Sequence, residues 1–401
     1  MLVPRKKTVA FEAALQRFLI PDLPLADDTL RYLRRADSTR WYSNFGPLVC
    51  EFEERLRSEL SASDPSPRAG DIHLTSVVTC THALEIGLRL TDIGPGKRVL
   101  VPALTFPASA LAVQHTGAEV LLADVDPADW SLTPTIARAI ASRVQIDAVM
   151  PVAVFGVPLP VPAWDEFTSE TDIPLVIDAA AALETQVVPA RGLVAYSLHA
   201  TKPFGIGEGG VLVGRSSDLI CKGRQYSNFG LIDRISCMEG TNAKMSEYHA
   251  AVGLAQLDRW NEIKRKRRDL LGLYNRHLQP LLDDVSLHPA IDEAVVSLLM
   301  LLLEAPVAES VMAEGKLHGI AMHRTYLPPL YDHPFFATLN LATTDGMILS
   351  RDVEAIERQA CMVNCERLQR RLLGVPFHAF MCEEDVATVV HHLRSALGRL
   401  S

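Results

Sequence analysis

Lys202 is the residue of this sequence best placed for covalent chemistry, because a short apolar run precedes it and a glycine-rich turn follows it. It stands in SLHATKPFGIGEGG, residues 197–210. A lysine acts as a nucleophile only as the neutral amine, so it must be desolvated enough for its pKa to fall. Ser197 and Thr201 offer hydroxyls of the kind that bind phosphate, and the glycines let the backbone turn tightly. An isolated lysine is more often a solvated surface charge, and on Lys202 alone this alternative stays open.

Asp178 is the acidic residue best placed to act with this lysine. It follows the apolar run PLVI and precedes four alanines, at the end of a predicted strand, where open α/β sheets bind ligands. An aspartate there could pair with a protonated pyridine nitrogen and keep such a ring an electron sink. The plainer alternative is an aspartate that caps the following helix.

The segment TCTHALEIGL, residues 79–88, predicts a helix start that binds an anion. Small polar residues open a run with helical spacing, and the first N–H groups of a helix, together with its dipole, attract phosphate. Thr79 could otherwise be only an N-cap. Each of the three features is weak alone, but together they point to one cofactor with a phosphate and a pyridine ring.

These residues lie in a region, residues 97–214, where short apolar runs alternate with helix-like stretches. This pattern is typical of a mainly parallel sheet with crossover helices, so we expect an α/β fold. The predicted strands cover residues 98–102, 119–125, 147–152, 174–177, 193–198 and 210–213. The predicted helices cover residues 48–60, 80–90, 109–115, 133–142, 162–169 and, as one long helix, 246–268.

The chain is long enough for two unequal domains, with 401 residues of which 48% are hydrophobic. The alternation weakens beyond residue 275, where strand-like runs mix with a closing helix over residues 383–397. We assign residues 46–275 to a large cofactor-binding domain and residues 276–401 to a smaller C-terminal α+β domain. Residues 1–45 are expected to be an N-terminal arm that contributes to the small domain and the active site.

Charge and composition exclude several classes of protein. The net charge of -9 argues against a nucleic-acid partner, since phosphate contacts need clustered Lys and Arg. The seven cysteines are scattered without a CxxC pair, so we expect reduced thiols in a cytoplasm and no metal site. The N-terminus lacks an apolar signal region, and the most apolar run, residues 294–303, is about half as long as a membrane helix. That run is expected to be a buried strand or a short core helix.

Six motifs in order resemble those of the DegT-type sugar aminotransferases, within the fold type I enzymes that use pyridoxal 5′-phosphate (PLP). They cover residues 41–53, 96–113, 122–127, 176–182, 197–210 and 240–258, and the likeness continues to PFHAFMCEEDV near the C-terminus. The resemblance implies a mainly parallel, seven-stranded sheet with helices on both faces and a smaller C-terminal domain. It implies a transaminase that moves an amino group from glutamate or glutamine to a keto-deoxysugar linked to a nucleotide.

The resemblance also assigns roles to single residues. Lys202 matches the lysine that forms the Schiff base with PLP and then moves the proton, and Asp178 matches the partner of the pyridine nitrogen. Phe106 matches an aromatic residue that stacks on the ring, although an aromatic residue between apolar ones is more often core. The phosphate ligands implied are the backbone of Thr81 and His82, the Ser197 hydroxyl and, from a neighbouring subunit, Asn242.

A homodimer with shared active sites follows from the role of Asn242. Glu247 is expected either to support the Asn242 loop or to make a local structural contact. Three positions depart from the usual pattern: Ala181 stands where many relatives have Gln or His against the ring hydroxyl, Cys80 where glycine is common, and Lys244 where Arg is common. We interpret these as marks of a subgroup, because Lys202 and Asp178 are both present.

Candidates for binding the acceptor come from two segments. Arg and aromatic side chains suit diphosphates and planar bases, although a packing cluster of Tyr and Pro is an equal alternative in the second segment. The candidates are Trp41, Tyr42, Asn44 and Phe45 in the arm, and His323, Arg324 and Tyr326 in MHRTYLPPLY. Other hypotheses are an aminocyclitol ketone as acceptor, a PLP-dependent sugar dehydratase, whose pattern has histidine in place of Lys202, and a non-catalytic regulatory relative.

Overall fold

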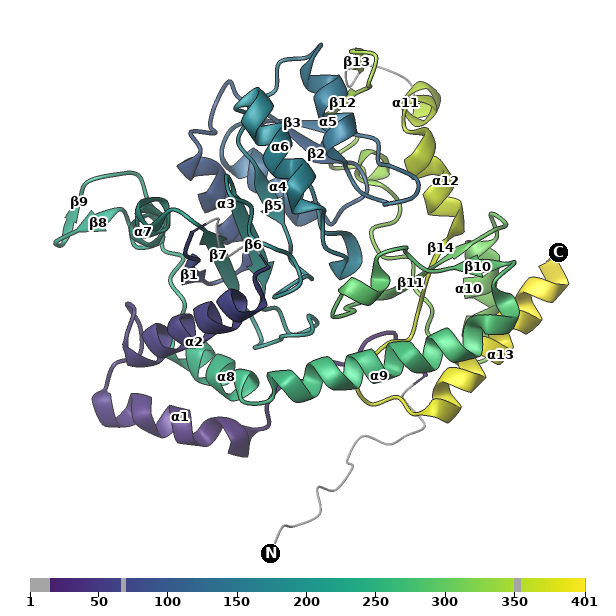
Figure 1. Cartoon of the computed structure of the whole chain (residues 1–401), viewed down its shortest axis with the longest axis horizontal. Helices are drawn as coiled ribbons and strands as arrows, with labels where there is room; N and C mark the ends of the chain where they lie inside the picture. The colour runs from purple at the N-terminus through teal and green to yellow at the C-terminus, as the bar shows by residue number, and fades with distance from the viewer. Residues whose placement is uncertain (1–14, 66–69, 350–354, 401) are drawn as a thin grey trace, which may run out of the picture.

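The computed structural model describes residues 15–65, 70–349 and 355–400, and its centre is one continuous twisted sheet (Figure 1). Seven strands make up this sheet in the order β3-β2-β4-β5-β6-β7-β1, with isolated parallel bridges joining β4 to β5. They are β1 (His73–Val77), β2 (Arg98–Pro102), β3 (Glu119–Ala123), β4 (Ala148–Val149), β5 (Val176–Asp178), β6 (Leu193–Ser197) and β7 (Gly210–Gly214). All pairs are parallel except those made by β7, so the expected mainly parallel sheet is confirmed.

Helices cover both faces of the sheet because successive side chains of each buried strand point to opposite sides. In β2, for example, Leu100 packs into one hydrophobic core and Val99 and Val101 into the other. The helices that contribute to the first core include α2 (Pro47–Ser63), α5 (Pro134–Ala141), α6 (Val161–Thr171) and α8 (Glu247–Leu257). Those that contribute to the second include α3 (Cys80–Leu90), α4 (Pro107–His115) and α7 (Ser217–Tyr226).

The sequence predicted six of these seven strands and most of the helices on the sheet, but it missed β1, α7 and α1 (Ala26–Thr39). The long helix predicted over residues 246–268 is wrong. The chain forms α8 and then α9 (Trp260–Leu278), with a break at Asp258 and Arg259. Asp258 ends α8 and accepts hydrogen bonds from the side chains of Tyr32 and Arg55, so contacts with α1 and α2 hold the break in place.

Two strands from the C-terminal part of the chain extend the large sheet. β12 (Asn340–Ala342) pairs in parallel with β3, and β13 (Ile348–Leu349) pairs antiparallel with β12. The boundary at residue 275 stays a prediction, but these strands show that the C-terminal segment does not pack as one separate block. Local sequence could not reveal this, because β12 and β3 are more than two hundred residues apart.

The rest of the C-terminal segment surrounds a small antiparallel sheet in the order β10-β11-β14. Its strands are β10 (Val285–Ser286), β11 (Leu299–Leu303) and β14 (Leu372–Val375), and its helices are α10 (Ala308–Leu317), α11 (Ala355–Cys361), α12 (Val363–Arg371) and α13 (Glu383–Leu400). The apolar run at residues 294–303 therefore ends in a buried strand, one of its two predicted forms. Among the described helices, none is both long and apolar enough to span a bilayer.

Candidate active site

The residues expected to do chemistry meet at one edge of the large sheet. β1, β2, β5 and β6 run in the same direction, so the loops that follow them lie at the same edge. Thr79 follows β1, Phe106 follows β2, Asp178 ends β5, and Lys202 follows β6. The topology thus brings together four segments that span more than one hundred residues of sequence.

Asp178 is a buried carboxylate that is held by neutral donors. The Ser109 hydroxyl donates to Oδ2 at 2.7 Å, and the backbone N–H of Ala180 donates to Oδ1 at 3.1 Å. Burial raises the pKa of Asp178 above its usual value, while these two hydrogen bonds and the charge of Lys202 act in the opposite direction. A buried carboxylate with neutral partners is suited to receive a cationic N–H group, such as that of a protonated pyridine.

Lys202 lies in the connection between β6 and β7. Backbone hydrogen bonds from Leu198 N–H to the Gly209 carbonyl (2.9 Å) and from Ala200 N–H to the Gly207 carbonyl (2.8 Å) fold this connection back on itself. Burial lowers the pKa of the Lys202 amine, and the nearby Asp178 acts in the opposite direction. Burial thus favours the neutral amine that Schiff-base chemistry needs.

The N-terminus of α3 supplies donors for an anion. The Thr79 hydroxyl accepts the His82 N–H at 3.3 Å and contacts His82 Nδ1 at 2.8 Å, so His82 takes part in the helix cap. Within the described part of the chain, the backbone N–H groups of Cys80 and Thr81 have no acceptor. The free donors at this helix start are therefore those of Cys80 and Thr81, one residue earlier than the pair expected from the sequence.

Gly210 allows α3 to start directly above β7. A Cβ atom at Gly210 would lie 2.4 Å from the carbonyl carbon of Thr79 and 2.5 Å from the Cys80 nitrogen. Ser197, which pairs with Gly210 across β6 and β7, is buried, and its hydroxyl accepts the His199 N–H at 3.2 Å. The free N–H groups of α3 and the Ser197 hydroxyl are thereby positioned around the same strand end.

Aromatic side chains form a wall beside Asp178. Phe106 is 59% exposed, so it is not a core residue, and its ring centroid lies 6.3 Å from that of Tyr326. Tyr326 stacks on Phe155 with ring centroids 4.9 Å apart and planes inclined by 11°. Burial raises the pKa of the Tyr326 phenol, and the charges of Asp178 and Cys80 raise it further.

The departures from the usual pattern are also inside or beside this site. Cys80 is buried, and burial together with the nearby Asp178 raises the pKa of its thiol well above the usual value. Ala181 is buried against the chain after β4, where a Cβ at Gly156 would lie 2.8 Å from the Ala181 carbonyl oxygen.

The other acceptor candidates of the second segment make structural contacts. His323 stacks on Phe18 with centroids 5.1 Å apart, and its backbone N–H donates to the Gly374 carbonyl. Arg324 donates to the Gln369 carbonyl and lies 3.6 Å from Glu309. Of the three candidates in this segment, Tyr326 is the one whose side chain lies in the electrostatic environment of Asp178.

The arm candidates pack near the start of α8 instead. Tyr42 stacks on Tyr248, Phe45 lies under the Arg224 guanidinium at 3.8 Å, and Trp41 is exposed. Glu247 is buried, and its carboxylate accepts the N–H groups of Leu48 and Val49 at 2.7 and 3.0 Å. Glu247 therefore makes a structural contact that caps α2, and Asn44 adopts a left-handed backbone just before it.

Asn242 lies on the surface beside the same region. Its Oδ1 accepts a 2.6 Å hydrogen bond from Lys244 Nζ, and Lys244 stacks on the Phe229 ring at 4.4 Å. The following residue, Ala243, accepts the Val78 N–H at 2.9 Å, so this loop runs next to the start of α3. The side chain of Asn242 is exposed at this surface.

Two functional contacts escaped the reasoning from sequence. The first is Ser109, which links Asp178 to Thr105 through hydroxyl contacts of 2.7 and 2.8 Å. A serine in the first turn of the helix after β2 was a signal, since that helix starts at the same sheet edge. The second is the contact of Gly210 with Thr79, for which the sequence held only the run of glycines.

The arrangement as a whole fits PLP. Free helix N–H groups and a buried hydroxyl suit its phosphate, a buried carboxylate suits its pyridine nitrogen, and an amine with a lowered pKa suits its aldehyde. Known proteins agree with this fit. The model of the DegT/DnrJ/EryC1/StrS aminotransferase family matches residues 25–394.

Several known proteins are similar to this chain. Protein Rv3402c of Mycobacterium tuberculosis is 30% identical over 94% of this chain and 89% of its own length. The 3-amino-5-hydroxybenzoate synthase of Amycolatopsis mediterranei is 30% identical over 64% and 67%, and the GDP-perosamine synthase of Caulobacter vibrioides is 26% identical over 91% and 94%. The solved structure of DesI in the presence of its TDP-sugar product superposes with a TM-score of 0.79 at 26% identity, covering 96% of this chain and 94% of DesI.

Proposed function

Since the chain belongs to the DegT/DnrJ/EryC1/StrS aminotransferase family and is a PLP-dependent aminotransferase, we propose that it transfers an amino group from glutamate or glutamine to a nucleotide-linked keto-deoxysugar. One observation carries the site assignment. The amine of Lys202, whose pKa burial lowers, and the buried carboxylate of Asp178 lie at the sheet edge where α3 presents free N–H groups. These three features match the three functional ends of PLP.

We assign each part of the cofactor to groups of this chain that would bind it. The N–H groups of Cys80 and Thr81 and the Ser197 hydroxyl hold the phosphate, and Phe106 covers one face of the ring. Asp178 binds the pyridine nitrogen, and Ser109 keeps its carboxylate oriented and charged. The chemistry that PLP supplies when bound is an electron sink for the carbon that loses or gains the amine.

Lys202 carries the proton in this proposal. Burial lowers its pKa, so the amine is neutral for a larger part of the time than that of a solvated lysine. With PLP bound, this amine would be the group that moves the proton between the substrate carbon that carries the amine and the C4′ carbon of the cofactor. A dehydratase is disfavoured, because the residue that has to be histidine in that reaction pattern is Lys202.

The proposal for the amino acceptor is based on the names of the relatives. DesI was solved with a TDP-sugar product, and GDP-perosamine synthase is named for a nucleotide sugar, which supports a keto-sugar nucleotide. In the acceptor site we include Tyr326, since its ring contacts that of Phe106 and the charge of Asp178 acts on its phenol. The relation to 3-amino-5-hydroxybenzoate synthase favours a second candidate, a carbocyclic ketone such as an aminocyclitol precursor.

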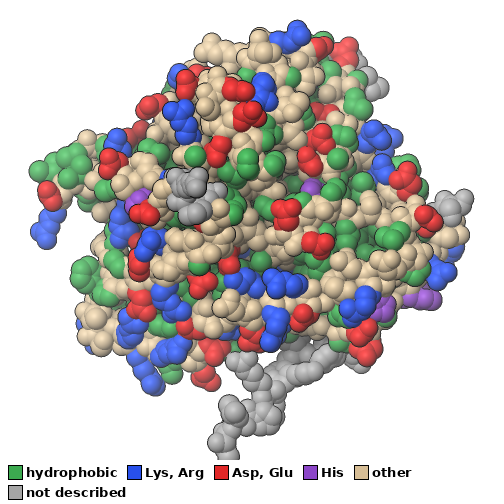
Figure 2. Space-filling model, in the orientation of Figure 1, with side chains coloured by type: hydrophobic (Ala, Val, Ile, Leu, Met, Phe, Trp, Pro, Cys, Tyr) green, Lys and Arg blue, Asp and Glu red, His purple; other side chains and the backbone are tan. Residues whose placement is uncertain are grey.

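We further propose a homodimer with shared active sites. Three exposed apolar residues lie on or just before the β8–β9 hairpin (Leu231–Ile232 and Ile235–Ser236), which projects from the body of the molecule: Phe229, Ile232 and Ile235 (Figures 1 and 2). Exposed apolar surface of this kind marks a protein interface. Asn242 pairs with Asn228 next to this hairpin, so it would reach the phosphate bound in the partner subunit. The exposed Trp41 and the neighbouring Tyr42, Asn44 and Phe45 would face the partner's acceptor site.

The proposal places the enzyme in the cytoplasm. All seven cysteines are unpaired, which suits a reducing compartment. Its partners there are the two small-molecule substrates and a second copy of the chain.

Half-reactions test the substrates separately. Glutamate or glutamine added to the purified holoenzyme without acceptor should shift the visible band of the bound cofactor, and the correct keto-sugar nucleotide should then restore it. A panel of keto-sugar nucleotides and cyclitol ketones would identify the acceptor. If neither amino donor shifts the band, the assignment of the donor is wrong. If only cyclitol ketones restore the band, the assignment of a keto-sugar as acceptor is wrong.

A further inference from the structure

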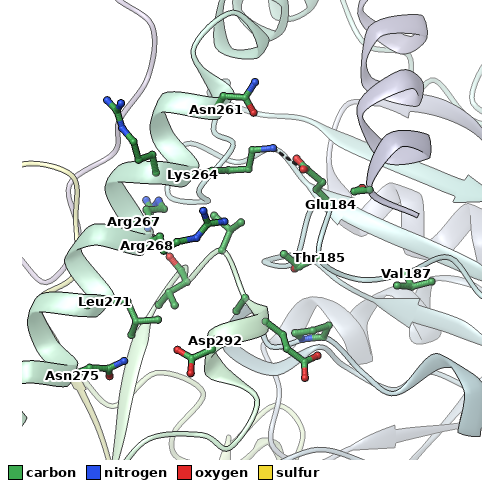
Figure 3. Close-up of a pocket in the computed structure, with 18 of the residues that line it drawn as sticks. Glu184, Thr185, Val187, Asn261, Lys264, Arg267, Arg268, Leu271, Asn275 and Asp292 are labelled. Atoms are coloured by element: carbon green, nitrogen blue, oxygen red, sulfur yellow. Dashed lines mark hydrogen bonds and ion pairs between the residues drawn. The ribbon is translucent and has the colours of Figure 1, made fainter. Parts of the chain in front are cut away.

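A second groove, away from Lys202, lies between α9 and two loops (Figure 3). Its volume is about 760 Å³, within the range of about 300 to 1,000 Å³ that small-molecule sites occupy. The facing loops are residues 184–187, which follow β5, and residues 292–296, which precede β11. Polar and apolar groups both line it.

One face of α9 presents a row of cations to this groove. Lys264, Arg267 and Arg268 are spaced at i, i+3 and i+4, so their side chains lie on the same side of the helix. Figure 3 shows Arg268 extending from α9 toward the loop with Thr185. This concentration of positive charge stands on a protein with a net charge of -9.

The guanidinium of Arg267 has hydrogen-bond partners for only some of its N–H groups. The side chain is 3% exposed; its Nη1 donates to the Val296 carbonyl at 2.8 Å, and its Nε has no partner among the described residues. Burial lowers the pKa of Arg267 to about 10. Asp22, the acid whose charge reaches it, pairs with Arg259 at 2.7 Å. A buried guanidinium in this state gains strongly from an anion, because charge-assisted hydrogen bonds satisfy its N–H groups.

One acidic residue of the groove pairs with one of these three cations. Glu184 holds Lys264 at 2.6 Å and also accepts the Trp260 indole N–H, so the Lys264 ammonium has a defined position. Asp292 and its neighbour Glu293 belong to a short 3-10 helix, and Figure 3 draws Asp292 toward the end of the groove near Asn275, away from Lys264. The groove is thus cationic at one end and less so at the other.

We propose that this groove binds a phosphorylated small molecule of about the size of a nucleotide, at a site separate from the catalytic one. The phosphates contact Arg268 and the edge of Arg267 that lines the groove, because guanidinium donors suit oxyanions, and Lys264 adds positive charge from its ion pair with Glu184. The organic part lies against Leu271, Val295 and Val296, which supply the apolar lining. The inference does not depend on the identity of the amino acceptor.

Calorimetry on the full-length holoenzyme tests the site, with Lys202 fixed to the cofactor by borohydride so that the catalytic phosphate position stays filled. The probes are inorganic pyrophosphate and uridine diphosphate at low salt. We expect saturable binding of both, tighter for uridine diphosphate because of the apolar wall. The substitution Arg268→Glu should weaken both about 10-fold or more, since it removes a charged donor and adds repulsion.

Lys266→Glu is the matched control. It makes the same type of charge reversal on the same helix, but Lys266 pairs with Glu262 at 2.8 Å and is outside the groove lining. Its effect should stay within about twofold, as for a distant surface charge. Arg268→Gln provides a milder second variant should the reversal disturb folding, and it should also weaken binding. Absence of binding, or binding that neither Arg268 variant weakens more than Lys266→Glu does, overturns the proposal, and equal affinity for the two probes overturns the assignment of the apolar wall.

Discussion

The Ser109 hydroxyl donates a 2.7 Å hydrogen bond to Oδ2 of Asp178, 69 residues further along the chain. Both groups are buried, and Thr105 contacts the Ser109 hydroxyl from the other side at 2.8 Å. The hydrogen bond opposes the effect of burial on the pKa of Asp178, so it favours the charged carboxylate. In the proposed site, the negative charge that would face a pyridinium nitrogen therefore depends in part on a serine in the neighbouring helix.

The substitution Ser109→Ala should accordingly weaken cofactor binding about 10-fold, the typical effect of losing a hydrogen bond to a charged group. The pKa of Asp178 should rise further, so the acid limb of the activity profile should move to higher pH. Titration of the apoprotein with PLP and a pH profile of the half-reaction measure the two effects. Ser142→Ala, at an exposed serine that bonds only to a backbone carbonyl, is the control. An acid limb at the wild-type pH would show that Ser109 does not influence the charge of Asp178.

The substitution Asp178→Asn should have opposite effects on apoprotein stability and on catalysis. Burial raises the pKa of Asp178 in the folded state above its value in the unfolded state. The favourable contribution of Asp178 to stability is therefore present below the pKa of the unfolded state, and it is lost as the pH rises through the pKa of the folded state. At neutral pH the buried carboxylate therefore costs stability, and the amide should raise the melting temperature of the apoprotein. PLP should stabilise the variant less than wild type, and most of the rate should be lost. Melting curves with and without PLP at neutral pH decide this; a variant apoprotein that melts lower, with wild-type rate, contradicts the assigned role.

The substitution Lys202→Ala should abolish turnover and the visible band of covalently bound cofactor while the fold stays intact. The change removes both the covalent attachment and the amine that moves the proton. Absorption spectra and single-turnover rates measure the loss, and Lys222→Ala, at an exposed lysine of α7, serves as control. Because burial lowers the pKa of Lys202, capture of PLP by the wild-type apoprotein should stay fast at pH values where a free lysine is slow. Near-normal activity of the alanine variant would exclude Lys202 as the catalytic lysine.

The substitution Gly210→Ala should damage the phosphate site through the backbone. A Cβ there would lie 2.4 Å from the Thr79 carbonyl carbon, and backbone cannot move aside like a flexible side chain. We expect a loss of about 1 to 3 kcal/mol in the free energy of unfolding, together with weaker PLP binding. Gly398→Ala, at a helical glycine with nothing within 4 Å of the added carbon, should leave both unchanged or slightly improve stability. Chemical denaturation and PLP titration compare the two; wild-type affinity in Gly210→Ala would mean that α3 does not hold the phosphate.

Mixing two inactive variants tests the shared site. If Asn242 serves the cofactor of the partner subunit, a heterodimer of Lys202→Ala and Asn242→Ala chains contains one intact site and one doubly altered site. Activity should therefore reappear in the mixture, at up to about half of the wild-type value per heterodimer, because two equivalent sites form at a symmetric interface. Subunit exchange is followed independently by mass spectrometry of tagged chains. Exchange without recovered activity would show that Asn242 acts only within its own chain.

The amino-acid sequence alone determined the type of fold and indicated the two residues that we propose for the centre of the chemistry. Buried strands appear as short apolar runs, since parallel strands are covered on both faces, and Asp178 and Lys202 each follow such a run. Local properties also set the helix start at Thr79, whose hydroxyl caps α3 as its position suggested. Such features depend on a few neighbouring residues, so they are visible without knowledge of distant contacts.

Only the tertiary structure decided which distant residues act together. The hydrogen bond from Ser109 to Asp178, the approach of Gly210 to Thr79 and the pairing of β12 with β3 all join segments that no local pattern connects. Burial is likewise a property of the packed molecule. In the sequence, Arg267 is one of several cations on a charged helix. Only the packed structure, in which its guanidinium donates to the Val296 carbonyl, makes it a buried side chain whose Nε–H group has no partner among the described residues. A side chain's charge state and its available donors depend on which atoms surround it in space, and chain order does not specify those atoms.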